Sequence, residues 1–129
     1  MRFLIVDDNA SFLEASRTLL ERHGLTVVGV ASDGATARQR AAELTPDVAL
    51  VDIDLGEESG FDVARQLAAS PTSAHVKVIL ISTHPEDDFA ELVAESPAVG
   101  FISKSDLSAA SIAELLHDSR QRPTEPPER

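Results

Sequence analysis

Short apolar runs recur along the chain and alternate with stretches of helical periodicity. Each run is four to six residues long, rich in β-branched residues and apolar at nearly every position. Such runs are typical of strands buried on both faces of a parallel sheet. One run alone could be a segment of a buried helix, but five at regular spacing favour strands. The predicted strands span residues 3–6, 25–30, 48–51, 76–81 and 99–102.

The stretches between these runs have apolar residues three and four positions apart, as in an amphipathic helix. In the first stretch, Phe12, Ser16 and Leu20 fall on one face. Pro85 suits the first turn of a later helix, and Ser108 suits an N-cap. The predicted helices span residues 9–23, 33–44, 59–69, 85–95 and 108 to about 120.

The pattern is therefore a strand followed by a helix, repeated five times. This alternation predicts an α/β fold of (βα)5 type, in which right-handed crossovers place helices on both faces of a parallel sheet. The 129 residues suit one domain, which we expect over residues 1–120. Residues 121–129 contain three prolines and no large apolar side chain, so we expect a flexible tail or linker there.

Composition narrows the classes of function. The 22 acidic residues outnumber the 11 basic ones and give a net charge of −11, which argues against direct binding to nucleic acid. The absence of cysteine excludes disulfides, thiolate metal sites and cysteine nucleophiles, and fits a reducing compartment. No apolar run approaches the ~18 residues that a membrane span needs, and acids follow the first run. We expect a cytoplasmic protein that does not interact with membranes.

Polar residues follow four of the predicted strands. Because the carboxyl ends of parallel strands lie along one edge of the sheet, these residues are expected to converge on one pocket. They are Asp7 and Asp8 after the first strand, Asp52 and Asp54 after the third, Ser82 and Thr83 after the fourth, and Lys104 after the fifth.

Such a cluster of carboxylates needs positive charge. Two unit charges ~4 Å apart at an effective dielectric constant of ~20 repel by about 4 kcal/mol. Lys104 supplies one positive charge, and carboxylate oxygens suit Mg²⁺, with Mn²⁺ as a second choice. A metal, a lysine and a hydroxyl beside a carboxylate fit phosphoryl transfer, in which an aspartate can be the acceptor.

Each of these residues alone has a plainer explanation. An acidic pair often complements a helix dipole, a serine often lies in a turn, and a lysine is often a solvated surface charge. Their joint placement at four strand ends favours a functional site.

With these residues in this order, the chain resembles the receiver domain of two-component response regulators over residues 1 to about 120. The segment 51–60 is similar to the loop around the phosphoacceptor of that family, and residues 100–104 are similar to its fifth strand. The resemblance implies a flavodoxin-like three-layer sandwich with a five-stranded parallel sheet of order 2-1-3-4-5.

The resemblance also implies a chemical role for each acid. Asp52 would accept a phosphoryl group from a phosphohistidine on a sensor histidine kinase or a phosphotransfer protein. Asp7, Asp8, Asp52 and the backbone carbonyl of Asp54 would bind Mg²⁺. Lys104 would pair with a phosphoryl oxygen.

Other positions would carry the switch. Ser82, with Thr83 beside it, would bind the phosphoryl group, and Phe101 would swing inward and alter the face formed by the fourth helix, fifth strand and fifth helix. Asp54 and His84 occupy positions that tune autodephosphorylation, although His84 equally fits a solvated turn.

Three positions depart from the family pattern. Gly56 stands where proline is usual, which predicts a more mobile loop after Asp52. Ser105 follows Lys104 where proline is common, so the expected geometry there is open. Phe101 lacks the hydroxyl of a tyrosine, so any signal through it would be steric.

The implied partners are a kinase or phosphotransfer protein, a downstream protein or an output domain that the sequence lacks, and a second copy in a phosphorylation-dependent homodimer. The chain would be a signalling switch, with no chemistry beyond its own phosphorylation and dephosphorylation. It is either a stand-alone receiver or one excised from a longer regulator.

Three other classes of protein share part of this pattern. A haloacid-dehalogenase-type phosphatase would share the Asp52-Ile53-Asp54 motif, but its acidic pair would come late in the chain, whereas Asp7 and Asp8 come early. A nonphosphorylated interaction module would have no reason to keep the site. A flavodoxin or Rossmann nucleotide-binding protein would need a glycine-rich phosphate loop, which the sequence lacks.

Overall fold

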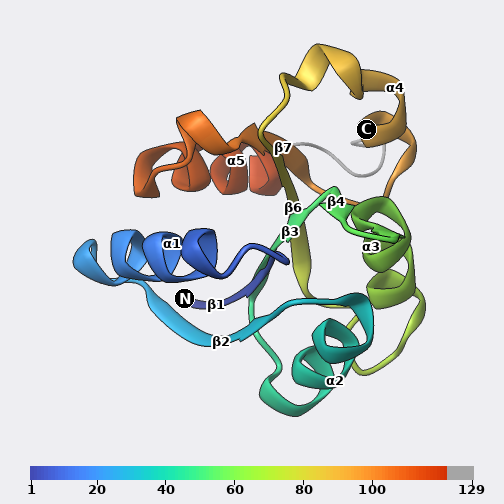
Figure 1. Ribbon diagram of the computed structural model, residues 1–129, viewed down its shortest axis with the longest axis horizontal. Helices are drawn as coiled ribbons and strands as arrows, with labels where there is room; N and C mark the ends of the chain where they lie inside the picture. The colour runs from blue at the N-terminus through green and yellow to red at the C-terminus, as the bar shows by residue number, and fades with distance from the viewer. Residues whose placement is uncertain (122–129) are drawn as a thin grey trace.

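The computed structural model describes residues 1–121, and its centre is a five-stranded parallel sheet (Figure 1). The spatial order is β2-β1-β3-β6-β7, which is 2-1-3-4-5 when the strands of this sheet are counted alone, so the predicted fold class and order are confirmed. The strands are β1 (Arg2–Val6), β2 (Thr26–Ala31), β3 (Val48–Asp52), β6 (Lys77–Ser82) and β7 (Gly100–Ser103).

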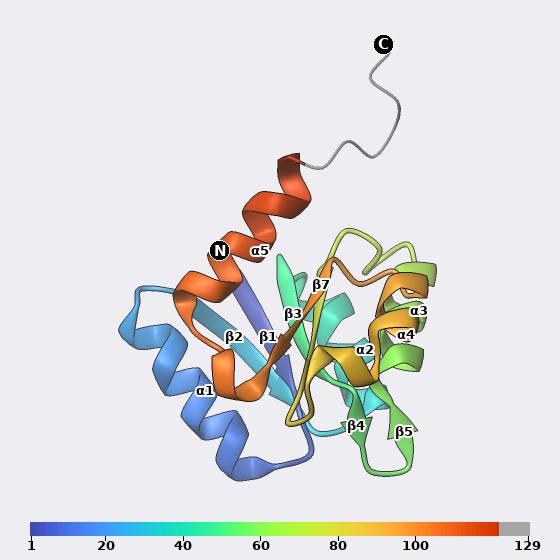
Figure 2. The same ribbon diagram turned by 90° about the horizontal axis from the view of Figure 1, so that it is seen from above.

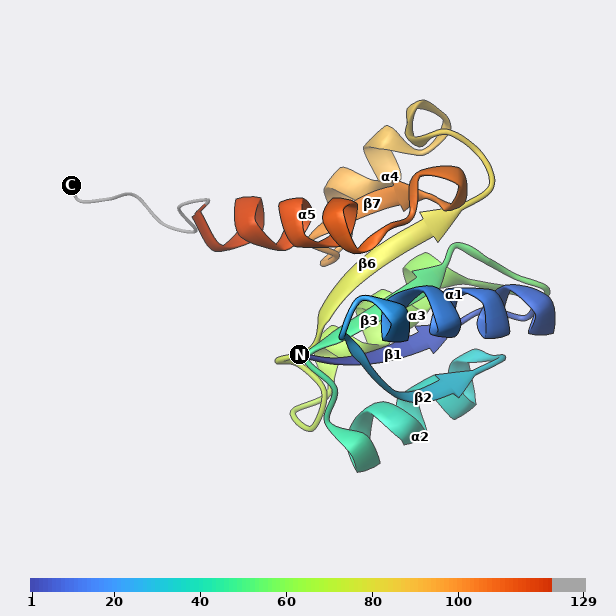
Figure 3. The ribbon, with the colours of Figure 1, turned by 90° about the vertical axis from the view of Figure 1, so that its left-hand side faces the viewer.

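Helices cover both faces of the sheet, which gives three layers (Figure 1), and Figure 3 views the same arrangement from one face. Alternate strand residues point to opposite faces, and two separate hydrophobic clusters result. Phe3 and Ile5 of β1 belong to the cluster under α1 and α5, and Leu4 and Val6 belong to the cluster under α2, α3 and α4. The helices are α1 (Ala10–Arg22), α2 (Gly34–Leu44), α3 (Gly60–Ala69), α4 (Ala90–Glu95) and α5 (Ala109–Gln121).

Polar side chains start several helices where the sequence predicts. The Asn9 side chain accepts a hydrogen bond from the Phe12 amide at 3.1 Å, and Ser108 Oγ accepts one from the Ser111 amide at 3.0 Å. Asp33 starts α2 in the same way, and hydrogen bonds from Thr36 lower the pKa of its carboxyl group. The predicted cap at Ser108 is therefore confirmed.

A small hairpin after β3 was not predicted. Its strands β4 (Asp54–Leu55) and β5 (Glu58–Ser59) pair antiparallel across a two-residue loop. Gly56 takes the first loop position with φ of +76°, a conformation that glycine adopts without strain. Gly56 therefore allows a tight turn at the point where the sequence predicts only a mobile loop.

The predicted helix over residues 85–95 is wrong at its start. Residues Glu86–Asp88 form a 3₁₀ turn, and α4 begins only at Ala90. Between them, Phe89 has φ of −130° and lacks a side-chain cap, so the helix is interrupted there. The ring centroid of Phe89 lies 6.4 Å from that of Phe61 and 6.3 Å from that of Phe101. The helix is therefore interrupted at a residue whose ring packs between two other aromatic rings.

The chain leaves the sheet through α5, as Figure 2 shows. This helix extends to Gln121, one residue past the predicted domain end. The rest of the predicted tail, residues 122–129, lies outside the described residues. None of the helices over residues 1–121 is both long and apolar enough to cross a membrane.

Candidate functional site

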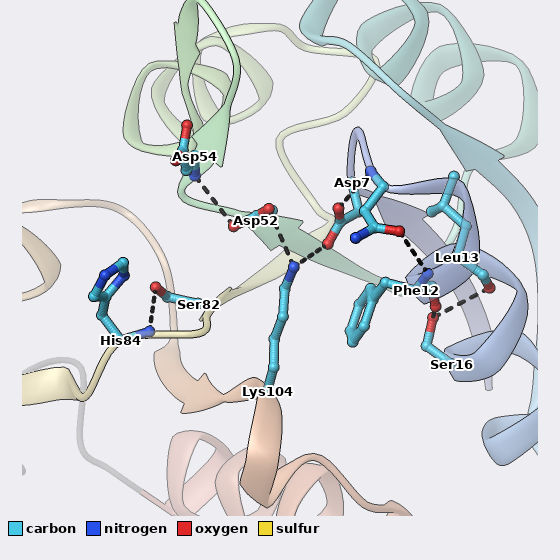
Figure 4. A network of polar contacts seen from close by, with 10 residues as sticks. Asp7, Phe12, Leu13, Ser16, Asp52, Asp54, Ser82, His84 and Lys104 are labelled. Carbon is cyan, nitrogen blue, oxygen red and sulfur yellow. Dashed lines mark hydrogen bonds and ion pairs between the residues drawn. The ribbon is translucent and has the colours of Figure 1, made fainter.

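The polar residues predicted at the strand ends lie at one edge of the sheet (Figure 4). They line a cavity of about 600 Å³. Asp52 and Ser82 are the last residues of β3 and β6, while Asp7 and Lys104 directly follow β1 and β7. Topology thus gathers these side chains as expected. The other predicted residues that line the cavity are Asp8, Asp54, Thr83 and His84.

Lys104 makes ion pairs with two of the acids. Its Nζ lies 2.6 Å from Asp7 Oδ2 and 3.3 Å from Asp52 Oδ2. Burial works to lower the pKa of Lys104, but Asp7 and Asp52 outweigh it and raise that pKa above its usual 10.5. The Lys104–Ser105 peptide is trans, and the Leu107 amide donates to the Lys104 carbonyl at 3.3 Å.

Asp52 lies deep in the cavity, with 6% of its surface exposed. Its Oδ1 accepts a hydrogen bond from the Asp54 amide at 3.1 Å, and its Oδ2 faces Lys104. Burial is the main cause that raises the pKa of Asp52 above 3.8, and the charge of Asp7 adds to it. The hydrogen bond from Asp54 and the ammonium of Lys104 work in the opposite direction.

Three acids bring carboxylate oxygens close together. Asp7, Asp8 and Asp52 each offer a carboxylate oxygen, and these atoms lie within 4.8 Å of one another. Asp7 is fully buried; among the described residues its Oδ2 finds no aligned hydrogen bond, only the ionic contact with Lys104. An all-oxygen donor set that includes the fully buried Asp7 carboxylate fits a hard divalent ion.

Gly60 constrains the backbone next to Asp52. A Cβ at this position would overlap the carbonyl oxygen of Asp52, so the start of α3 can approach β3 only with glycine there. The Gly60 amide also donates to the Ile53 carbonyl at 2.9 Å. The glycine therefore holds the segment after Asp52 against the end of its own strand.

Ser82 and its neighbours form the far wall of the cavity. Ser82 is 2% exposed, and its Oγ accepts a hydrogen bond from the His84 amide at 3.0 Å (Figure 4). Thr83 and His84 are exposed. Ser82 thus lines the same cavity as the acids, while its hydroxyl caps the turn that leads toward α4.

Phe101 does not share this cavity. Its ring is 8% exposed and packs against Phe89, which in turn contacts Phe61 and the edge of His84. Phe101 also lines a groove of about 420 Å³ together with Leu115 of α5. These rings form one aromatic cluster, which consists of Phe61, His84, Phe89 and Phe101, and the first three of them line the cavity.

The sequence pattern does not identify every residue that lines or supports the cavity. Phe61 and Phe89 line the cavity, and the sequence pattern assigned them only to helix faces. Glu58 accepts a hydrogen bond from the Gly34 amide at 2.7 Å and so ties the β4–β5 hairpin to α2. A glycine between Leu55 and Glu58 could have signalled the hairpin, but no local signal marks its contact with α2.

Comparison with known proteins agrees with this geometry. The response regulator receiver domain family matches residues 3–116. The chain belongs to this family. Its receiver fold is shared with the response regulator domain of CheB from Thermotoga maritima, with 29% identity, a TM-score of 0.73 and 94% of each chain covered. A LuxR-family two-component response regulator from Aurantimonas has 27% identity and a TM-score of 0.80, over 94% of this chain and 86% of that one.

Curated relatives are longer than this receiver. Response regulator GacA of Pseudomonas viridiflava is 31% identical over 93% of this chain and 54% of its own length. Protein-glutamate methylesterase/protein-glutamine glutaminase 5 of Myxococcus xanthus is 37% identical over 81% of this chain but only 30% of its own length. The chain thus spans about half or less of these relatives, and the match covers the signalling domain alone.

Proposed function

We propose that this receiver is a phosphorylation-controlled switch and that Asp52 accepts the phosphoryl group from a phosphohistidine of a sensor histidine kinase or phosphotransfer protein. The observation that carries the proposal is the pairing of a deeply placed Asp52 carboxylate with Lys104, beside Asp7 and Asp8, in one open cavity. The family match supports the same role. The proposed compartment is the cytoplasm.

The proposed transfer is a single displacement at phosphorus. A carboxylate oxygen of Asp52 forms the new P–O bond while the P–N bond to the donor imidazole breaks, and the imidazole leaves with that electron pair and takes up a proton. Lys104, already 3.3 Å from Asp52 Oδ2, is placed to neutralise charge on the phosphoryl oxygens.

Asp7, Asp8 and Asp52, with the backbone carbonyl of Asp54, are the proposed ligands of Mg²⁺, and Mn²⁺ would suit the same oxygens. The ion would supply positive charge that Lys104 alone cannot. The chain contributes the oxygens, two of them from buried residues, and keeps them close enough together to share one cation.

The proposed signal passes from Ser82 to Phe101. The Ser82 hydroxyl, which now accepts from His84, would donate to the phosphoryl group and draw the turn before α4 inward. Phe89 contacts both His84 and Phe101, so movement of that turn would reach Phe101 and the groove between β7 and α5. Phosphorylation of Asp52 would thus change the surface around Phe101 through a few contacts.

That surface, formed by α4, β7 and α5, is the proposed site for a downstream protein or for a second copy in a phosphorylation-dependent dimer. Asp54, Thr83 and His84 line the cavity next to the acceptor, where they would adjust access of water to the acyl phosphate. Apart from its own phosphorylation and dephosphorylation, we propose no enzymatic activity.

Intact-mass measurement tests the proposal. The protein is incubated with acetyl phosphate or phosphoramidate, with Mg²⁺ or with EDTA. We expect one Mg²⁺-dependent phosphoryl adduct on the wild type and on Asp62→Asn, an exposed control on α3, and none on Asp52→Ala. Failure of both donors and of a phosphorylated histidine kinase to modify the wild type, or an adduct that survives Asp52→Ala, would overturn it.

A further inference from the structure

Phe12 contacts Lys104 from outside the cavity. The Nζ of Lys104 lies 4.3 Å from the centroid of the Phe12 ring, within the range of a cation–π interaction. Figure 4 shows the ring beside the lysine side chain, on the side away from Ser82. The residues that line the cavity do not include Phe12, so it would not touch a phosphoryl group.

We propose that Phe12 is a positioning residue for phosphoryl transfer, because it holds the Lys104 ammonium at the acceptor through a cation–π contact. This inference rests on the proposed function of the site. Lys104 has a long, flexible side chain and needs several contacts to be fixed in one orientation.

Hydrogen bonds on both sides hold the backbone that carries the Phe12 ring. The Phe12 amide donates to Asn9 Oδ1 at 3.1 Å, and its carbonyl accepts from Ser16 Oγ at 2.6 Å. The amide of Asn9 in turn donates to Asp7 Oδ1 at 2.8 Å. One chain of hydrogen bonds therefore links the buried acid Asp7 to the residue whose ring faces Lys104 (Figure 4).

Phe12 differs from the other partners of Lys104. The two ion pairs, to Asp7 and Asp52, involve carboxylates that also serve the proposed cation and the proposed acceptor chemistry. The ring competes for neither role. Phe12 is therefore the contact that can keep the ammonium in position while the charges on its other partners change.

The first test compares rates of phosphorylation by acetyl phosphate at saturating Mg²⁺, followed by intact mass. Phe12→Leu keeps an apolar side chain but removes the ring, and we expect the rate to fall about three- to tenfold. Phe12→Tyr keeps the ring and should stay within about twofold of the wild type, with thermal unfolding of each variant as the control for folding.

A double-mutant comparison separates positioning from packing. In a Lys104→Met background, measured over longer times, Phe12→Leu should change the residual rate by less than about twofold, because the ring has no ammonium left to hold. An equal loss in both backgrounds, an unchanged rate in Phe12→Leu alone, or an equal loss in Phe12→Tyr would overturn the proposal.

The contact also has a readout that does not depend on phosphorylation. The ring current of Phe12 should shift the side-chain methylene protons of Lys104 upfield in NMR spectra, and Phe12→Leu should abolish the shift. The only other lysine of the sequence, Lys77, is the internal reference. If the wild type takes no phosphoryl group but shows this shift, the proposed function fails while the contact stands; absence of the shift refutes the contact itself.

Discussion

The Nζ of Lys104 lies closer to Asp7 Oδ2, at 2.6 Å, than to Asp52 Oδ2, at 3.3 Å. The lysine thus neutralises the fully buried acid as well as the proposed acceptor. A divalent cation bound by Asp7, Asp8 and Asp52 would supply positive charge to the same carboxylates. The ammonium of Lys104 and the bound cation should therefore repel each other, so that each weakens the interaction of the other with these carboxylates.

Lys104→Met is predicted to bind Mg²⁺ more tightly, by about tenfold. That factor is a modest part of the roughly 4 kcal/mol by which two unit charges ~4 Å apart interact at an effective dielectric constant of ~20. Calorimetric titration would measure the dissociation constant, with Lys77→Met as an exposed control that keeps the wild-type value. An unchanged or weaker affinity in Lys104→Met would show that the two charges do not compete.

Asp52→Asn is predicted to unfold less readily than the wild type at pH 7 in the absence of divalent ions. Burial raises the pKa of Asp52 in the folded protein above 3.8, so the folded state holds this proton more tightly than the unfolded chain does. The stability that Asp52 contributes is complete below pH 3.8 and is lost as the pH rises through the folded pKa.

The ionised Asp52 therefore costs stability at neutral pH, and the amide removes that cost. Urea unfolding of both proteins at several pH values in EDTA would measure the difference in free energy of unfolding. The advantage of Asp52→Asn should shrink as the pH falls through the raised folded pKa of Asp52 toward 3.8, and should change no further below that pH. A wild type that is the more stable protein at pH 7 would refute this account.

Glu58→Ala is predicted to lower the free energy of unfolding by about 1 kcal/mol, which is typical of a lost helix-terminal hydrogen bond. It removes the acceptor of the Gly34 amide at the start of α2. Glu58→Gln keeps an acceptor oxygen and should recover much of the loss. Hydrogen exchange at the Gly34 amide gives the local measurement and should quicken in Glu58→Ala. The matched control is Glu57→Ala in the same turn, and equal effects at both positions would contradict the link to α2.

Gly60→Ala is predicted to destabilise the protein by more than about 2 kcal/mol, since overpacking against fixed backbone forces the chain to shift. The added Cβ would overlap the Asp52 carbonyl, and the shift would move the proposed acceptor and the start of α3. Urea unfolding would measure the loss, and slower phosphorylation by acetyl phosphate should accompany it. A variant of wild-type stability and rate would show that this close approach does not constrain the acceptor.

The sequence predicts both the parallel sheet and the convergence of the site residues, because both follow from topology. Apolar runs such as residues 48–51 are buried on both faces, so their length and spacing reveal the strands. Once the strands are parallel, Asp7, Asp52, Ser82 and Lys104 must lie at one edge. No knowledge of side-chain contacts is needed for that step.

The structural features that the sequence pattern does not predict depend on contacts between segments that are distant in the chain. Phe89 breaks its helix because it packs against Phe61 and Phe101, which local periodicity cannot reveal. The partner of Glu58 lies 24 positions earlier in the chain. Phe12 appears in the sequence only as one apolar residue on a helix face, and its contact with Lys104 emerges from the packing of α1 beside the end of β7.

Locating the phosphoryl group tests the central claim most directly. The protein is phosphorylated with acetyl phosphate and Mg²⁺, and the acyl phosphate is then reduced with borohydride, which converts a phosphorylated aspartate to homoserine. Digestion and tandem mass spectrometry locate the homoserine. We predict it at position 52 alone, and only when Mg²⁺ is present. Homoserine at Asp7, Asp8 or Asp54, or none after modification by the donor, would contradict the assignment of Asp52 as the acceptor.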